Sequence, residues 1–467
     1  MTHNPARTLS IADAIFVVVG IVIGAGIFRT PSLVAANSGS DAAFLLMWVA
    51  GGVVAAIGAL CYAELASTYP STGGDYHFLH RAFGRGPAFL FAWARITVMQ
   101  TGSIALLAFA FGDYAAAALP FAGDDSAAVY AALSVVVLTL VNVRGIREGK
   151  HTQRMLTSIE VIGVIAVAIA VLALAGGAPA AAAGEAAARP ASAAASFGVS
   201  MVFVLLTYGG WNEAAYVSAE VRGERAPLAR ALIIGIVTIT SLYLLINYAF
   251  LHALGREGMA ASAAVGAAAM ERALGAPGIA LVSVLVAVCA LTSINATIIT
   301  GARCNHALGR DFPPLAFLGQ WDARGGTPRN ALLVQGALAL LLVALGAGTR
   351  SGFQTLVEYT APVFWLFFLL TGAALLRLRR RDREASRPFR VPLYPLTPLV
   401  FCATSAWMLW SSVTYTGVGA LVGVAVLVLG VPVLWMLRAR TLRPVQGDHD
   451  ETRPSAARVA HEHRSGD

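Results

Sequence analysis

About twelve apolar runs follow one another along this chain, and each is long enough, as a helix, to cross roughly 30 Å of hydrocarbon. Hydrophobic residues make up 57% of the sequence and charged residues only 12%, a balance outside the range of soluble proteins of this length. We therefore expect an all-α integral membrane protein. The runs cover approximately residues 11–36, 42–68, 86–112, 127–144, 153–176, 197–219, 229–254, 277–305, 329–348, 353–377, 393–412 and 416–437.

The positions of Lys and Arg between the runs predict the topology. Alternate loops hold most of them, and cytoplasmic loops of membrane proteins are enriched in these residues. The basic loops contain Arg81 and Arg85, then Arg144, Arg147, Lys150 and Arg154, then Arg222, Arg225 and Arg230, then Arg310, Arg324 and Arg329, and finally the arginines of 377–390. Both termini are therefore expected in the cytoplasm, with the protein in an inner or plasma membrane.

The net charge of +8 has the same explanation, because the basic residues fall between apolar runs and form no patch suited to nucleic acid. We expect one transmembrane domain over about 1–440 and a polar cytoplasmic tail over 441–467. An Ala- and Gly-rich external loop is expected near 176–195. The cysteines lack the spacing of metal ligands, so we expect no metal, no other cofactor and no disulfides. They are Cys61, Cys289, Cys304 and Cys402.

The first apolar run contains an unusual stretch, Gly20-Ile-Val-Ile-Gly-Ala-Gly-Ile-Phe-Arg-Thr-Pro31. Gly24 and Gly26 flank one alanine, and each glycine costs about 1 kcal/mol in a helix interior. An unwound segment inside a membrane is tolerated only beside protein or a water-filled cavity. It exposes N–H groups at the positive end of the following half-helix, where a carboxylate can bind. The alternative is that Gly24-Ala25-Gly26 is a small-residue face for helix packing.

A second glycine pair, Gly209-Gly210, lies in the sixth run, five runs after the first. Interrupted helices in corresponding positions of two halves indicate a transporter built from inverted repeats, with its site near the bilayer midplane. The repeats would cover about 11–176 and 197–377, and two peripheral helices would cover 393–437. Carbonyl groups freed near Gly209 would hold an ammonium group. A ligand with neighbouring carboxylate and ammonium groups is an α-amino acid.

Several motifs resemble the amino acid-polyamine-organocation superfamily, and in particular its L-type amino acid transporter branch. They are Gly24-Ala-Gly-Ile-Phe28, Tyr62-Ala-Glu-Leu65, Ser71-Thr-Gly-Gly-Asp-Tyr76, Tyr208-Gly-Gly-Trp-Asn212, Thr300-Gly-Ala-Arg303, Ala307-Leu-Gly-Arg-Asp311 and Arg387-Pro-Phe-Arg-Val-Pro-Leu-Tyr394. The resemblance implies a LeuT-like fold of ten core and two peripheral helices, with interruptions in helices 1 and 6. It also implies amino acid transport by alternating access, as a proton symporter or an amino acid exchanger.

The same resemblance implies the substrate-binding residues. Their backbone would bind the carboxylate in the first run and the amino group in the sixth, with a tryptophan beside the site. These residues are Ile23, Gly24, Ala25, Gly26 and Ile27, then Tyr208, Gly209, Gly210 and Trp211. Leu206 stands where L-type members often carry an aromatic gate, so the side-chain specificity stays open.

Other polar residues have two interpretations each. Glu64, with Asp75 near Arg81 and Arg85, forms either a gate or a structural ion-pair cluster. Glu213 lines a vestibule or pairs with an arginine. Ser293 and Asn295 belong to a core polar site or make ordinary interhelical hydrogen bonds.

Two further acidic residues also have alternatives. Glu358 is an external gate or an interfacial anchor. Glu160 is the acidic residue in the apolar body of the fifth run, at a position where proton-coupled relatives carry a lysine. It is either a proton-binding coupling residue or the static partner of an arginine such as Arg154 or Arg303.

The sequence lacks the motifs of a membrane-embedded enzyme, such as HExxH, GxSxG or paired intramembrane aspartates. The expected partners are an amino acid, the lipid bilayer and protons as a candidate coupling ion. An amino acid-gated channel or receptor on the same fold is the alternative function.

Overall fold

The computed structural model describes residues 9–119, 123–177, 193–221, 227–262, 264–347, 361–417 and 420–441. Across these ranges the chain is helical and forms no β-strand, only isolated bridges such as that between Leu9 and Val221. The helices are α1 (Ile11–Val22), α2 (Gly26–Ala36), α3 (Asp41–Thr68), α4 (Asp75–Phe83), α5 (Arg85–Ala94), η1 (Arg95–Met99), α6 (Gln100–Ala118), η2 (Gly123–Asp125), α7 (Ser126–Arg144), α8 (Ile146–Leu174), α9 (Ala193–Thr207), η3 (Trp211–Glu213), α10 (Ala214–Val217), η4 (Ser218–Glu220), α11 (Pro227–Ala261), α12 (Val265–Leu274), α13 (Ala276–Asp311), η5 (Pro313–Leu315), α14 (Arg329–Ala347), α16 (Ala361–Arg381), α17 (Leu396–Thr416) and α18 (Ala420–Thr441).

Nine helices within the described ranges are long and apolar enough to cross a membrane, and shorter apolar helices, including α1, accompany them. The all-α expectation is confirmed. The first and sixth apolar runs differ from most of the others because each is divided. The first run forms α1 and α2, and the sixth forms α9 followed by the short turns η3, α10 and η4.

The third run is also irregular. A π-helical turn, η1, interrupts the apolar helix that continues from α5 into α6. Such turns widen a helix by one residue and frequently occur at functional sites. Here the turn begins at Arg95, a buried residue of the site described below.

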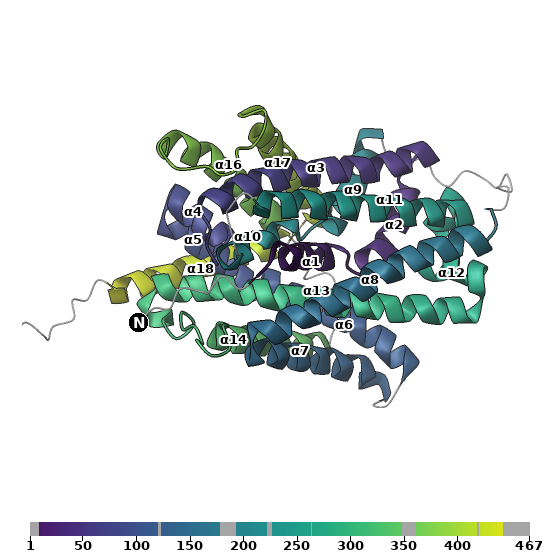
Figure 1. Cartoon of the computed structure of the whole chain (residues 1–467), viewed down its shortest axis with the longest axis horizontal. Helices are drawn as coiled ribbons and strands as arrows, with labels where there is room; N and C mark the ends of the chain where they lie inside the picture. Colours follow the sequence, from purple (N-terminus) through teal and green to yellow (C-terminus); the bar gives the residue numbers. More distant parts are fainter. Residues whose placement is uncertain are drawn as a thin grey trace, which may run out of the picture.

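The helix α1 lies in the middle of the bundle, between α11, α8 and α13 (Figure 1). A small residue allows this close packing. A side-chain carbon added to Gly20 would lie 2.1 Å from Thr157 Oγ1 and 2.6 Å from a methyl group of Thr292. Gly20 therefore allows α1 to pack closely against α8 and α13.

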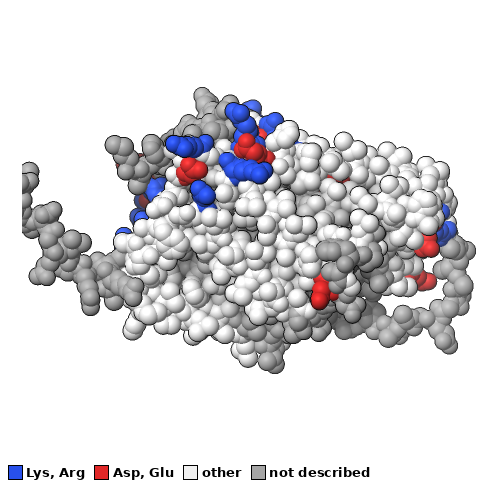
Figure 2. All heavy atoms as spheres, turned by 90° about the horizontal axis from the view of Figure 1, so that it is seen from below, with Lys and Arg blue, Asp and Glu red and all other residues white. Residues whose placement is uncertain are grey.

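The outer surface fits a lipid environment. Figure 2 shows most of the visible charged side chains near one end and a broad surface free of charge beside them. Large apolar side chains are exposed on many of the helices, for example Leu281, which is 56% exposed. We call the end that holds α4, the α7–α8 turn and the end of α16 the basic end, because Arg81, Arg144 and Arg379 lie there.

Some expectations fall outside the described residues. They are the loop over 178–192, Glu358 with the beginning of the tenth run, and the tail beyond residue 441.

Candidate functional site

The two interrupted runs meet each other. A side-chain carbon added to Gly210 would lie 3.0 Å from Ile21 Cγ2, and one added to Gly26 would lie 3.6 Å from Thr207. Thr207 also donates a hydrogen bond of 2.9 Å from its hydroxyl to that of Thr30. The end of α1 and the start of α2 therefore lie beside the end of α9 and the turn that follows it.

Tyr243 of α11 joins the two interruptions. Its hydroxyl lies 2.6 Å from the carbonyl oxygen of Val22, the last residue of α1, and 3.0 Å from that of Thr207, the last residue of α9. Carbonyl groups at a helix end have no partner inside the helix. The tyrosine therefore supplies a shared donor to both helix ends. Sequence reasoning missed Tyr243, because a tyrosine in an apolar run gives no sign of where its hydroxyl points.

The beginning of α2 is open to a ligand. Among the described residues, no side chain caps this helix start. The N–H groups of Ile27 and Phe28 donate to the carbonyls of Gly24 and Ala25, whereas the N–H groups of Ala25 and Gly26 make no such backbone hydrogen bond. Gly26 is exposed, and Gly24 and Ala25 are partly exposed, although they lie in the middle of an apolar run. The positive end of α2 can accept an anionic group here.

The second interruption depends on the backbone of Gly210. Its φ of 112° lies in the left-handed region, where a side chain is strained. Gly209 and Gly210 are both partly exposed. The sixth run therefore turns at the glycine pair and leaves its backbone accessible beside the start of α2.

The side chains around the glycines are mostly packed into protein. Ile23 and Ile27 are buried, and the hydroxyl of Tyr208 donates a hydrogen bond of 3.0 Å to the carbonyl of Trp48. Trp211 packs in an aromatic cluster with Tyr62, and its indole stacks on the Phe368 ring with centroids 5.7 Å apart. The Leu206 side chain, in contrast, is 63% exposed.

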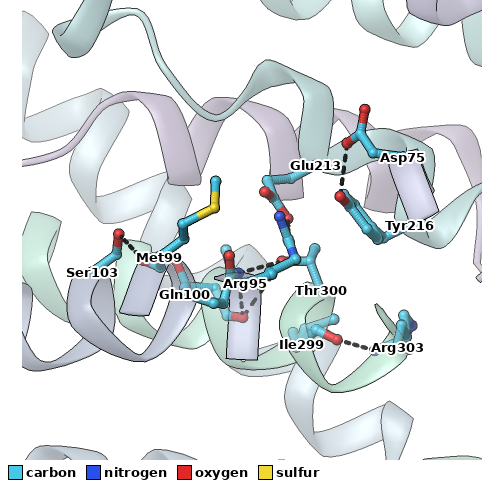
Figure 3. A network of polar contacts seen from close by, with 12 residues as sticks. Asp75, Arg95, Met99, Gln100, Ser103, Glu213, Tyr216, Ile299, Thr300 and Arg303 are labelled. Carbon is cyan, nitrogen blue, oxygen red and sulfur yellow. Dashed lines mark hydrogen bonds and ion pairs between the residues drawn. The ribbon is translucent and has the colours of Figure 1, made fainter. Parts of the chain in front are cut away.

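Two buried ion pairs follow the second interruption. Glu213 lies 2.5 Å from Arg95 (Figure 3). Glu220 lies 2.5 Å from Arg303. The guanidinium of Arg95 also stacks over the Tyr216 ring at 4.0 Å. The residues after Gly210 form the short turns η3, α10 and η4 rather than one α-helix, so Glu213 and Glu220 do not share one helical face. For Glu213, the arginine pair is the arrangement that the structure contains.

A third cluster lies at the basic end, and its partners differ from those expected. Glu64 pairs with Arg379 at 2.5 Å and accepts a hydrogen bond from the backbone N–H of Val391. Arg81, which was expected beside Glu64, pairs instead with Asp382 at 2.9 Å. This cluster joins α3 to the end of α16 and to the segment that follows it.

Asp75 is buried beneath three hydroxyl groups. Those of Tyr62, Tyr216 and Thr371 all donate hydrogen bonds to its carboxylate. Burial raises its pKa, against the lowering effect of the hydrogen bonds. The carboxylate joins α4 to α3, α10 and α16.

The polar residues of α13 make interhelical hydrogen bonds. Ser293 donates to the carbonyl of Gly20 at 3.3 Å, next to the first interruption. Asn295 donates to Gln153 Oε1 at 2.9 Å and accepts from Asn142 at 2.7 Å.

Glu160 of α8 is fully buried, and neither carboxylate oxygen has a hydrogen-bond partner that meets ordinary geometry among the described residues. The thiol of Cys289 is its polar neighbour. The arginines considered as partners are engaged elsewhere, since Arg154 lies 2.5 Å from Asp13 and Arg303 pairs with Glu220. The static ion pair expected as one alternative for Glu160 is therefore wrong for both named arginines.

Comparison with known proteins identifies this arrangement. The pattern of the family described as amino acid permease matches residues 9–433, nearly the whole chain. This chain belongs to the amino acid permease family. The resemblance to the L-type branch of the superfamily is confirmed by its relatives. The permease is thus a multi-pass membrane protein of a transporter family and not an enzyme.

The relatives align over most of their length. The permease is 31% identical to the b(0,+)-type amino acid transporter 1 of Mus musculus over 414 residues, covering 87% of the chain and 83% of the relative. It is 29% identical to the large neutral amino acids transporter small subunit 2 of Mus musculus over 438 residues, covering 92% and 81%. The b(0,+)-type transporter 1 of Homo sapiens is 28% identical over 395 residues, covering 84% and 80%.

Proposed function

We propose that this permease carries α-amino acids across the membrane by alternating access. The substrate carboxylate binds the N–H groups at the start of α2, over Ile23 to Ile27, and the amino group binds carbonyls of Tyr208 to Gly210. The observation that carries the proposal is the meeting of the two interruptions, with accessible backbone on both sides. A positive helix end and freed carbonyl groups so close together suit a zwitterion.

The fold that goes with this function is a twelve-span, LeuT-like arrangement of two inverted five-helix repeats and two peripheral helices. The division of the first and sixth runs supports it, because these runs occupy corresponding positions in the two halves. We further propose that the basic end faces the cytoplasm, with both chain termini on that side.

In this orientation the structure corresponds to a state closed to the cytoplasm. The pairs Arg95–Glu213, Arg303–Glu220 and Arg379–Glu64 join separate helices on the cytoplasmic side of the interruptions. Gly26 and Leu206, on the other side, are exposed. Leu206 is then a residue of the external vestibule, and the glutamates belong to the cytoplasmic closure.

We propose that the substrates have uncharged side chains. Glu213, an acidic residue close to the glycine pair, is neutralised by Arg95 at 2.5 Å and is not free to bind a cationic substrate. A relative named for large neutral amino acids is consistent with this class.

Two modes of energy coupling are compatible with this site. In a proton symporter, Glu160 would bind the coupled proton, and its burial without a basic partner supports this role. In an exchanger, one amino acid leaves as another enters and no proton is needed. The relatives leave both modes open for this chain.

Relatives named as small subunits imply a companion subunit for those proteins. All four cysteines of this chain lie within helices α3, α13 and α17. We therefore propose that no loop disulfide links it to a companion. A single band of unchanged mobility on reducing and non-reducing gels from native membranes is expected.

The proposed function is tested by counterflow. Purified protein in liposomes loaded with an unlabelled neutral amino acid should accumulate the labelled one transiently. Binding without counterflow would indicate a receptor, and flux without counterflow would indicate a channel.

A further inference from the structure

The helix α8 carries a row of buried polar side chains that leads from the basic end to Glu160. Gln153, Thr157 and Glu160 are spaced by four and three residues and therefore share one face of α8. All three are at most 1% exposed. The amide of Gln153 donates to the Thr157 hydroxyl at 3.1 Å, and this hydroxyl donates to the carbonyl of Phe16 in α1 at 3.1 Å.

The row continues through two asparagines to the turn between α7 and α8. Asn295 donates to Gln153 Oε1 at 2.9 Å and to the carbonyl of Gly149 at 3.3 Å. Asn142 donates to Asn295 Oδ1 at 2.7 Å. Asn142 and Gly149 flank the turn that carries Arg144, at the basic end of the bundle. We call Asn142, Asn295, Gln153 and Thr157 the polar row.

The helix α1 covers the part of the polar row that lies on α8, Gln153 and Thr157. A side-chain carbon added to Gly20 would lie 2.1 Å from Thr157 Oγ1 and 2.5 Å from Gln153 Nε2. No space for water remains between these groups while α1 is in place. If α1 moves away from α8, the hydroxyl and amide groups lose this cover, and a polar site of sufficient size holds water.

Within the part of the chain that the structure describes, the groups that face Glu160 do not include a fixed positive charge. Cys289 faces it from α13, and Tyr243 interacts with it from α11. The charged residues of the other helices packed against α8 lie elsewhere. Asp13 of α1 is bound by Arg154, Arg144 of α7 is exposed, and Glu271 and Arg272 of α12 are exposed. A carboxylate buried without a cation is costly, so its ionisation requires water.

We propose that the polar row is the proton path between Glu160 and the cytoplasm, and that α1 opens and closes it. This inference rests on the proposed transport function and on Glu160 as the coupling residue. When α1 leaves α8 to release the substrate, water enters along Gln153 and Thr157. The O–H bond of the Glu160 carboxyl then breaks, and the proton passes to that water and on to the cytoplasm. The carboxyl regains a proton from the external side before the next inward step, so that one proton crosses the membrane with each substrate.

The test uses protein in liposomes and two measurements on each variant. One is the initial rate of net uptake driven by an imposed pH gradient, and the other is exchange at equal pH on both sides. Gln153→Leu keeps the size of the side chain but breaks the row. Gln335→Leu is the matched control. Gln335 belongs to α14, and its buried amide also makes hydrogen bonds to α13, but outside the polar row.

We expect Gln153→Leu to lower gradient-driven uptake roughly tenfold or more, since positioned proton-transfer groups contribute about 10²–10⁴-fold to rates. Exchange should stay within about twofold, as in the control. Equal losses in both measurements, or an unchanged response to the gradient, would overturn the proposal. Wild-type exchange with no response to a pH gradient would also overturn it and leave the transport function intact. Absence of wild-type exchange would instead refute the proposed function.

A second measurement covers the case in which Gln153→Leu does not fold. Cys289, next to Glu160, is fully buried in this closed state. In a variant that retains Cys289 alone, with Cys61, Cys304 and Cys402 replaced by Ala, a water-soluble methanethiosulfonate added from the cytoplasmic side should label the thiol. Labelling should be faster when substrate cycling opens that side. A thiol that is never labelled from the cytoplasmic side would contradict a water path along the polar row.

Discussion

The hydroxyl of Tyr243 lies 2.6 Å from the carbonyl oxygen of Val22, at the point where α1 ends. The same hydroxyl lies 3.0 Å from the carbonyl of Thr207, where α9 ends. One side chain of α11 thus fixes the positions of the two helix ends relative to each other. In the proposed mechanism these helix ends hold opposite ends of the substrate. Their relative position therefore determines how well the carboxylate and the amino group bind at the same time.

Tyr243→Phe should weaken substrate binding more than it weakens the fold. The Thr207 carbonyl loses its hydroxyl donor, which costs about 1–3 kcal/mol for an unsatisfied group, while the Val22 carbonyl keeps the N–H of Gly24 as a donor. We expect a raised KM for exchange with a smaller change in maximal rate. Tyr248→Phe is the control, because Tyr248 is on the same helix and is 54% exposed. Equal KM values for the two variants would contradict the bridging role.

Gly26→Leu should abolish uptake while the protein still folds. A carbon added to Gly26 meets only Thr207, at an ordinary contact distance of 3.6 Å, so a leucine there would occupy the space proposed for the carboxylate. Gly20→Ala should fail differently, because its added carbon would lie 2.1 Å from Thr157 Oγ1. Thermal stability in detergent separates the two effects. Retained uptake at wild-type affinity in Gly26→Leu would remove Gly26 from the site.

The Arg95–Glu213 pair should show strong coupling between its members. Arg95→Met leaves the buried Glu213 carboxylate without a partner, and breaking a buried pair in this way costs about 3–5 kcal/mol. The double variant Arg95→Met with Glu213→Gln should recover a large part of that loss. Denaturant or thermal unfolding of the two single variants and the double variant measures the coupling. Simple addition of the two single losses would show that the pair does not act as a unit.

The free energy of unfolding should fall as the pH drops below the ordinary pKa of histidine. Burial and the nearby Arg81 lower the pKa of His77 in α4 to about 4, from an ordinary value of 6.5. Between these values the unfolded chain binds a proton that the folded chain excludes, so the folded state loses stability as pH falls from 6.5 towards 4. His77→Gln should show a shallower decline of melting temperature over this interval. Above pH 7.5 the pH slopes of the two proteins should be the same.

The positions of the interruptions could be predicted from the sequence because glycine affects the local backbone directly. Gly24 and Gly26 lie where α1 gives way to α2, and Gly210 adopts a left-handed conformation after α9. The apolar runs also predicted the helices well, since a membrane span is a property of one contiguous segment.

The partners of the charged and hydroxyl groups could not be predicted in the same way. Arg81 pairs with Asp382, and Arg154 pairs with Asp13. Each arginine has other carboxylates that are closer to it in the sequence. These contacts depend on how distant helices rotate and pack. Gly20 illustrates the same limit, because it belongs to the first glycine motif but serves close packing against Thr157.

The most direct test of the account is competition in the counterflow assay between a neutral amino acid and its two blocked forms, the methyl ester and the N-acetyl derivative. Each interruption is proposed to bind one end of the zwitterion, so each blocked form should lose nearly all of its ability to compete. Competition by the methyl ester as strong as that by the free amino acid would contradict the binding of the carboxylate at the start of α2.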